Sequence, residues 1–267
     1  MAKKKTTYEV DGIFRDAWVE VPENEPKAWG PDAEMSVLGK PLPRVDGPDK
    51  VSGRAKYTHD INLPRMLWAK ILRCPHAHAK IVAIDTSKAE ALPGVKAVLT
   101  HKNTPEMPWH FHGNDARLLS ATLRYPGEEV AVVAAVDEHT AADALALIEV
   151  EYEELPFVLD AEKALESDSP RVRGESNLLP RQPSVYSRGD VEKGLAEADF
   201  VVEQTFRSQV QVHACLETHA SVAQWSGDKL TVWDSTQAVH PVREQLAQML
   251  SLPISKVRVI CQYSGGS

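Results

Sequence analysis

The sequence predicts a mixed α+β protein with two folded domains. Three observations support this fold class. Short apolar runs of strand length alternate with short helical patterns. A proline-containing stretch separates two such regions. The chain has 267 residues, of which 43% are hydrophobic, and this is enough for two cores that each bury a sizeable surface.

The first 37 residues are expected to form an extended arm rather than a domain. They are polar, contain Pro22, Pro26 and Pro31, and show no sustained hydrophobic period. The basic run Lys3 to Lys5 is interpreted as a solvated tail. Arms of this kind usually wrap a partner or another domain.

Strands and short helices alternate in the first domain, which is assigned to residues 38–158. Strands are expected at Met66–Arg73, Lys80–Ile84 and Val95–Leu99, with a short helix at Ser87–Leu92. The best-defined unit is a strand, a helix and a strand at Glu129–Asp137, Glu138–Leu147 and Ile148–Tyr152. Ala134 and Leu147 are expected to be buried between sheet and helix.

A linker is predicted over residues 159–187, in a stretch rich in proline and charge, and the second domain over residues 188–267. Asp190 could cap the first helix of this domain. Helices are predicted at Val191–Ala198 and Val242–Leu250. Strands are predicted at Phe200–Val212, Ser221–Trp225, Leu230–Trp233 and Lys256–Cys261.

Composition excludes several functional classes. The net charge of −8 and the pI near 5.7 argue against a nucleic-acid or anionic-membrane partner, since those need a dense basic surface. No apolar stretch is long enough to span a bilayer, and no apolar signal segment follows the basic start, so a cytoplasmic protein is expected. Cys74, Cys215 and Cys261 form no Cys-x-x-Cys pair, so any iron–sulfur cluster must come from a partner.

Histidine pairs are the obvious metal candidates. Cys74, His76 and His78 lie close together in sequence, and so do His110 and His112; imidazole and thiolate ligands suit zinc or copper. Each pair supplies only two good ligands, so a structural role is favoured and no metal site is predicted.

Two further groups of residues leave alternatives open. Glu217, close to His213 and His219, could act in general acid–base catalysis or could anchor a structural hydrogen-bond network, which is the favoured interpretation. The pair Gly265-Gly266 directly follows a strand, where backbone N–H groups can approach an anionic ligand, although most such pairs form turns. No phosphate-binding glycine loop is present, which disfavours nucleotide binding.

Four stretches, taken together, resemble the large, molybdenum-binding subunit of the xanthine oxidase, aldehyde oxidase and carbon monoxide dehydrogenase family. The first runs from Gly39 to Asp60 (GKPLPRVDGPDKVSGRAKYTHD), and the second from Gly127 to Pro156. The third joins Gly189-Asp190 to His213, Glu217 and Trp225. The fourth comprises Ser235-Thr236-Gln237, the following helix and strand, and Gly265-Gly266. Order and spacing fit over nearly everything after residue 37.

The resemblance implies an α/β-hammerhead domain followed by the beginning of a mixed α+β molybdopterin-binding domain. In the family no protein side chain ligates the molybdenum, which the pterin holds. A glutamine in the Ser-Thr-Gln motif hydrogen-bonds an oxo group on the metal, and the glycine loop contacts the cofactor. The resemblance therefore assigns cofactor binding to Gln237, Gly265, Gly266 and Ser267. A helix cap near Val239 is the alternative role for Gln237.

The implied chemistry is hydroxylation of an electron-poor carbon with oxygen derived from water, since a metal lowers the pKa of the water it binds. Electrons would leave through iron–sulfur clusters and FAD on partner subunits. The glycine motif stops before its usual Phe-Gly continuation, and no residue here can be assigned as the general base. We therefore expect either a split subunit or a fragment, and an isolated chain without activity.

The rest of the site would come from a second molybdopterin-binding polypeptide or from a missing segment, with a [2Fe-2S] subunit and an FAD subunit as further partners. The substrate would be a small aromatic, N-heterocyclic or aldehyde compound. The other hypotheses are a non-catalytic scaffold or binding module of the hammerhead fold, and a small protein that binds metal through its histidine pairs.

Overall fold

The computed structural model describes residues 2–10, 13–21, 29–30, 32–105, 108–109, 116–174, 176–178, 185–186 and 188–266. Contacts divide the chain into two units, Met1–Arg54 and Ala55–Ser267. His110, His112 and Ser267 from the sequence predictions lie outside the described residues. Among the helices that are described, none has the length and apolar character needed to cross a bilayer.

The first unit contains a β-hairpin and a short helix. Strand β1 (Ala2–Val10) pairs antiparallel with β2 (Ile13–Val21). Asp16 on β2 accepts a hydrogen bond of 2.8 Å from Thr7 and forms a 2.7 Å ion pair with Lys5. Little in the sequence of the predicted arm indicates these strands, because residues 3–7 of β1 are all polar and the apolar alternation in β2 is short. Helix α1 follows at Gly47–Val51.

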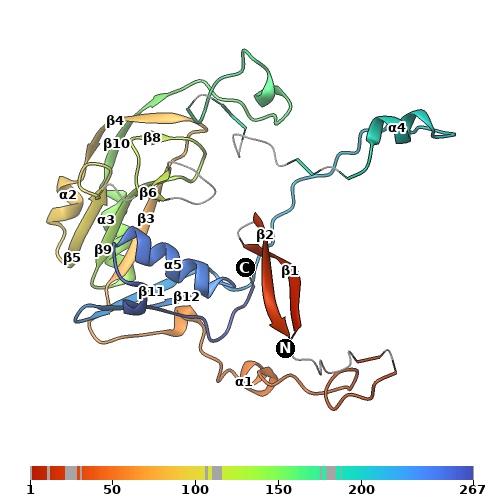
Figure 1. Cartoon of the computed structure of the whole chain (residues 1–267). Helices are drawn as coiled ribbons and strands as arrows, with labels where there is room; N and C mark the ends of the chain where they lie inside the picture. The colour runs from red at the N-terminus through yellow and green to blue at the C-terminus, as the bar shows by residue number, and fades with distance from the viewer. Residues whose placement is uncertain are drawn as a thin grey trace. The chain divides into compact units, whose positions relative to one another are not determined.

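Two antiparallel three-stranded sheets form the first part of the second unit (Figure 1). One sheet has the order β3-β9-β5, with bounds Trp68–Arg73, Glu129–Ala135 and Val95–Thr100. The other has the order β10-β4-β8, with bounds Glu149–Glu154, Ala79–Asp85 and Thr122–Leu123. A two-stranded pair, β6 (Pro108–Trp109) with β7 (Ala116–Arg117), completes the strands of this part. Its helices are η1 (Thr58–Asp60), α2 (Ser87–Ala91) and α3 (Glu138–Ala146).

A single apolar core contains residues of both sheets. Strand β9 is the central strand of its sheet and contributes Val130, Ala131 and Val133. Helix α3 contributes Ala144, and β4 contributes side chains from the other sheet. Such two-sided burial explains the nearly continuous apolar run of β9.

The predicted strand–helix–strand unit is confirmed as a set of elements, with two corrections. Strands β9 and β10 belong to different sheets, so α3 connects two layers instead of crossing over within one sheet. Ala134 and Leu147 are only partly buried. Their neighbours Ala135 on β9 and Ala144 on α3 are among the fully buried residues, because side chains alternate between the two faces of a strand and only one face of the helix meets the core.

Helix α3 begins where the sequence places a capping residue. Asp137 accepts hydrogen bonds from the backbone N–H of Thr140 at 2.8 Å and from its hydroxyl at 3.0 Å. The backbone N–H of Thr140 is the larger cause that holds the pKa of Asp137 below its usual value. The cap therefore favours the ionised carboxylate.

The last part of the second unit is a β-hairpin followed by a parallel crossover. Strand β11 (Ser221–Ser226) pairs antiparallel with β12 (Lys229–Asp234), and β12 pairs in parallel with β13 (Val257–Ile260). Helix α5 (Val239–Met249) makes the connection, with the short η4 (Ile254–Lys256) before β13. A second, smaller core joins helix and sheet through Leu230, Val232, Ala247 and Val257.

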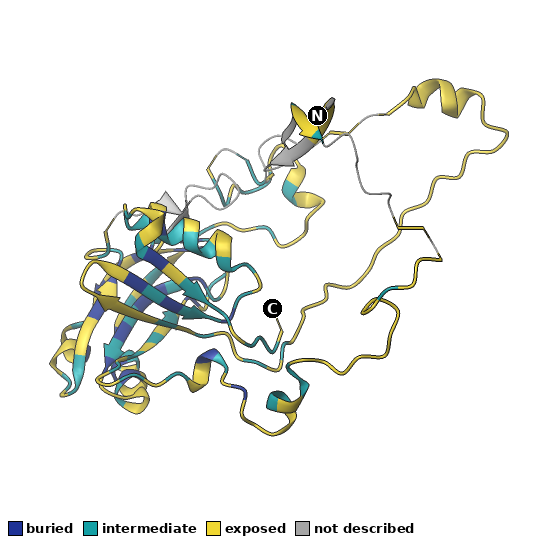
Figure 2. Cartoon of the chain, turned by 60° about the horizontal axis from the view of Figure 1, so that its bottom comes forward, coloured by how far each residue is buried: buried dark blue, intermediate teal, exposed yellow. Residues whose placement is uncertain are grey.

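The long strand predicted at Phe200–Val212 is wrong. The structure has no strand between α4 (Val191–Ala196) and β11, and residues 200–212 are exposed along their length (Figure 2). Phe206 and Val210 have exposed fractions of 86% and 94%. An extended segment becomes a strand only when a neighbour accepts and donates its backbone hydrogen bonds, and none does so among the residues that the structure describes.

Candidate functional site

Two loops begin at the same end of the C-terminal sheet, where strands β12 and β13 terminate. Strands β12 and β13 run parallel, with Trp233 opposite Ile260, so the segments that follow them emerge side by side. The loop after β12 carries Ser235-Thr236-Gln237 and leads directly into α5. The loop after β13 carries Ser264-Gly265-Gly266. Open α/β sheets bind ligands at the carboxyl ends of their parallel strands, and the N-terminus of α5 adds a positive dipole there.

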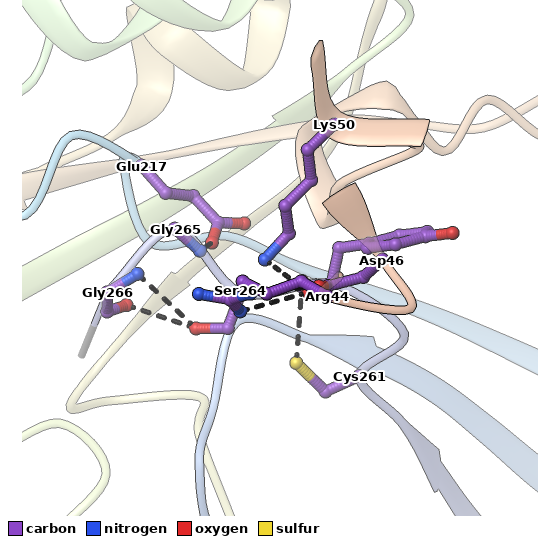
Figure 3. Close-up of polar contacts among 9 residues, drawn as sticks. Arg44, Asp46, Lys50, Glu217, Cys261, Ser264, Gly265 and Gly266 are labelled. Atoms are coloured by element: carbon purple, nitrogen blue, oxygen red, sulfur yellow. Dashed lines mark hydrogen bonds and ion pairs between the residues drawn. The ribbon is translucent and has the colours of Figure 1, made fainter. Parts of the chain in front are cut away.

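The carboxylate of Glu217 joins these two loops. Its Oε1 accepts a 2.9 Å hydrogen bond from the hydroxyl of Ser235. Its Oε2 accepts a 2.5 Å hydrogen bond from the backbone N–H of Gly265, and Figure 3 shows this carboxylate beside the glycine loop. Ser235 is buried, and its hydroxyl oxygen also accepts from the backbone N–H of Ala220 at 3.3 Å. Three segments that are distant in sequence therefore meet at one carboxylate.

The glycine loop packs against residues 215–217 without room for side chains. A Cβ atom on Gly265 would lie 2.5 Å from Cβ of Glu217, and one on Gly266 would lie 2.9 Å from Cβ and Sγ of Cys215. Gly266 also has φ of +122°, which L-residues rarely adopt. Its backbone N–H lies 3.4 Å from the hydroxyl oxygen of Ser264. Both positions thus require glycine for packing within this chain.

The sequence-predicted site residues occupy different environments. Gln237 is exposed, immediately before the N-cap of α5, which is Ala238 and has no side-chain cap. The hydroxyl of Thr236 accepts from the N–H of Ala238 at 3.0 Å and so stabilises the turn that carries Gln237. The N–H of Gly265 is already bonded to Glu217. Glu217 therefore connects the neighbours of Gln237 to the glycine loop.

The network interpretation of Glu217 agrees with this geometry. Its two oxygens accept hydrogen bonds from Ser235 and Gly265, whereas His213 and His219 are exposed. In the sequence, Cys215 is one of three separated cysteines and has no other distinguishing feature. No local pattern could indicate its position against Gly266, because the two residues are far apart in the sequence and meet only through the tertiary structure.

The histidines near Cys74 have partners within the protein. His78 is buried, and its Nδ1 lies 2.7 Å from the carbonyl oxygen of Pro156. The Nδ1 atom of His76 lies 3.3 Å from a carboxylate oxygen of Glu154. Burial raises the pKa of the Cys74 thiol. Within the described ranges, no group of three or more His, Cys, Asp or Glu residues is arranged to hold a metal ion.

Two family models match the chain, and each matched range contains one of the two apolar cores. Residues 52–156 match the model for the aldehyde oxidase and xanthine dehydrogenase a/b hammerhead domain, and residues 175–267 match the molybdopterin cofactor-binding domain. The chain belongs to the molybdenum-binding large-subunit family of xanthine oxidase, aldehyde oxidase and carbon monoxide dehydrogenase. The mixed α+β class and the hammerhead prediction are confirmed.

Curated members of this family are similar over most of the chain. It is 38% identical over 236 residues to the nicotinate dehydrogenase large molybdopterin subunit of Eubacterium barkeri, which covers 87% of this chain and 55% of that protein. It is 37% identical over 236 residues to the xanthine dehydrogenase molybdenum-binding subunit of Escherichia coli O157:H7, covering 84% and 31%.

Solved structures of the family share the fold. Reconstituted CO dehydrogenase from Oligotropha carboxidovorans superposes with a TM-score of 0.74 at 34% identity, covering 86% of this chain and 31% of that one. Quinoline 2-oxidoreductase from Pseudomonas putida 86 gives a TM-score of 0.73 at 32% identity, covering 85% and 30%. The chain thus spans about a third to a half of the length of these relatives.

Proposed function

We propose that this chain supplies one side of a molybdopterin site in a molybdenum-dependent hydroxylase or dehydrogenase. The observation that carries the proposal is the meeting of the Ser235–Gln237 loop with the glycine loop at the carboxyl edge of β12 and β13. This edge lies within residues 175–267, which match the cofactor-binding domain. The activity would be hydroxylation of an electron-poor carbon in a small aromatic, N-heterocyclic or aldehyde substrate.

The donor set at this edge fits a large anionic pterin cofactor better than a metal ion bound by side chains. Gln237 presents an exposed amide, and the first turn of α5 presents backbone N–H groups. Gly265 and Gly266 have no side chain that would cover the backbone of the loop after β13. Molybdopterin, when bound, would supply a metal centre that activates water and accepts electrons.

The four proposed cofactor-binding residues would each have a distinct role. The amide of Gln237 would donate a hydrogen bond to an oxygen of the cofactor, because it is exposed and no cap of α5 uses it. Gly266 and Ser267 would line the cofactor with their backbone. Gly265 would contribute by its small size, since its N–H is bonded to Glu217. The general base is expected outside this chain.

We also propose the wider organisation. The division is an arm at 1–37, a hammerhead domain at 38–158, a linker at 159–187 and part of the first molybdopterin-binding domain at 188–267. The remaining molybdopterin-binding part would come from a second polypeptide or from a continuation of this one. Subunits with [2Fe-2S] clusters and FAD would carry the electrons away, in a cytoplasmic complex. The chain alone would be inactive and would not retain the cofactor.

The test is Gln237→Ala in the protein that includes the rest of the cofactor-binding part, with the exposed Gln248→Ala on α5 as control. Loss of a preorganised hydrogen bond of this kind costs roughly 2.7–4 kcal/mol, so turnover per molybdenum should fall about a hundredfold in Gln237→Ala. Metal content and subunit composition should stay close to wild type. The control should keep its rate.

Metal analysis of the same preparations decides between functional classes. Stoichiometric molybdenum together with iron supports the proposal. Zinc alone, or no metal in a folded and fully assembled protein, would contradict it in favour of a metal-binding protein or a non-catalytic scaffold. An unchanged rate per molybdenum in Gln237→Ala would remove Gln237 from the site.

A further inference from the structure

The hydrogen bonds of Glu217 connect the two segments whose relative position matters for the proposed site. Ser235 lies two residues before Gln237, and Gly265 lies in the loop after the neighbouring strand. In the described part of the chain, residues 235–237 make no direct hydrogen bond to residues 264–266. Beyond the pairing of β12 with β13, from which the loops emerge, the carboxylate of Glu217 is therefore what links them by hydrogen bonds.

We infer that Glu217 is a positioning residue, which holds the glycine loop at residues 264–266 against the Ser235–Gln237 loop. The inference rests on the proposed function for its role in catalysis, but the connection itself is a property of this chain. Each oxygen of the carboxylate already accepts a hydrogen bond from the protein. Glu217 would thus act on the cofactor through the two loops.

A carboxylate suits this position better than any other side chain. It offers two acceptor oxygens and no donor, which matches one hydroxyl and one backbone N–H. The negative charge strengthens both hydrogen bonds. A glutamine would keep one acceptor for Gly265 but would present an NH₂ group to Ser235, whose hydroxyl oxygen already accepts from Ala220. An alanine would leave both donors without a partner.

The packing of the loop makes the connection specific. A Cβ built on Gly265 would lie 2.5 Å from Cβ of Glu217, and one built on Gly266 would lie 2.9 Å from Cys215, so the loop backbone rests directly on residues 215–217. Sliding the loop along this surface would break the bond between Glu217 and Gly265. The two glycines allow the loop to pack closely on residues 215–217, and the hydrogen bond from Gly265 to Glu217 fixes its position along that surface.

The first experiment measures amide exchange in the full 267-residue chain labelled with ¹⁵N-glycine, for wild type, Glu217→Ala, Glu217→Gln and the exposed control Glu244→Ala. Exchange of the Gly265 amide should become about tenfold faster in Glu217→Ala, because its charged acceptor is lost. Glu217→Gln should fall between this variant and wild type. The control should match wild type. Unchanged exchange at Gly265 in Glu217→Ala, with the chain still folded, would overturn the inference.

The second experiment uses the assembled protein and compares turnover, KM and molybdenum content. Glu217→Ala should lower turnover per molybdenum about tenfold, since a displaced loop misplaces the cofactor, and Glu217→Gln should recover most of the rate. A purely structural role would lower the yield of folded protein and leave the rate per molybdenum unchanged, which would overturn the catalytic part of the inference.

The two experiments separate this inference from the proposed function. Faster Gly265 exchange in Glu217→Ala, with no molybdenum in the assembled wild-type protein, would refute the proposed function and leave the loop connection standing. Normal molybdenum content and activity, with Gly265 exchange unaffected by Glu217→Ala, would refute the connection alone.

Discussion

Strand β9 and residues 200–212 both have a sequence pattern that predicts a strand, but they differ in structure. Both contain several valines, but β9 is apolar almost throughout, whereas apolar and polar residues are mixed in the second stretch. In β9, Val130 and Val133 are fully buried between neighbours on either side. In the second stretch, Phe200 and Val210 are more than 90% exposed. An apolar pattern indicates which face of a segment is to be covered, whereas the neighbouring segments decide whether it becomes a strand.

The largest expected effect would test this difference directly. Val133→Asp places an unpaired charge in the hammerhead core and should destabilise the chain by about 3–5 kcal/mol or leave it insoluble. Val210→Asp, the same change in the exposed stretch, should shift stability by less than about 0.5 kcal/mol. Urea unfolding of both variants measures the contrast. Equal losses would show that residues 200–212 are packed in solution.

A second contrast concerns glycines of the C-terminal region that have positive φ. Gly266→Ala adds a contact with Cys215 to an unfavourable backbone angle, whereas Gly227→Ala in the β11–β12 turn meets open space at φ of +60°. We expect a cost of roughly 1–2 kcal/mol for Gly227→Ala, from the backbone alone. For Gly266→Ala we expect a further 1–3 kcal/mol, roughly, from the contact. Thermal unfolding of each variant, with far-UV circular dichroism, measures both.

The result of that comparison bears on the proposed site. If the two variants cost the same, Gly266 does not lie against Cys215 in solution. The surface described for the glycine loop would then be incorrect, although the β12–α5–β13 unit would be unaffected.

Two helix-capping residues give the same contrast between a packed and an exposed region. Asp137 caps α3, which packs on the core, and Asp190 caps α4, whose residues are all exposed. Asp137→Ala should lower the melting temperature by roughly 2–4 °C at neutral pH, while Asp190→Ala should leave it unchanged. Because the pKa of Asp137 is lowered in the folded state, its contribution is present above the unfolded pKa and is lost as pH falls through the folded pKa. The difference between wild type and Asp137→Ala should therefore vanish in acid.

The smallest expected effect involves the buried Cys74. Its pKa is raised by burial, so the protonated thiol stabilises the folded state, and this contribution is lost as pH rises through the folded pKa. Alkylation by iodoacetamide at mildly alkaline pH should modify Cys74 more slowly than it does in the chain unfolded by urea, as read by mass spectrometry of the Cys74 peptide. Equal rates in both states would show that the hammerhead core opens readily.

Local pattern was sufficient for most of the elements and insufficient for their pairing. The strands at β4 and β5, helix α3 and the β11–β12 hairpin lie within a few residues of the predicted bounds, because alternation, caps and turn residues act locally. The sequence could not predict that β9 and β10 lie in separate sheets, because the same helix could connect two strands of one sheet or two strands of different sheets. The β1–β2 hairpin could not be predicted with the same ease, because residues 3–7 of β1 are polar and one of its cross-strand contacts is the ion pair of Lys5 with Asp16.

For the candidate site, too, some residues could be predicted from the sequence and their contacts could not. Resemblance to the family predicted cofactor binding by Gln237 and the two glycines. The local sequence around Glu217 predicted that it takes part in a hydrogen-bond network. Its bond to Gly265 joins residues that are separated in the sequence by three strands and helix α5, so only the tertiary structure brings them together. Cys215 carried no signal of its contact with Gly266 for the same reason.

The bond between Glu217 and Gly265 also has a consequence for the order of folding. It closes a loop of 48 residues, within which the β11–β12 hairpin and the β12–α5–β13 crossover already make shorter closures. Because closing a long loop costs chain entropy that nearer contacts must first reduce, we expect the glycine loop to take its position after the sheet beneath it. The cofactor edge would then be the last part of this region to become ordered as the chain folds.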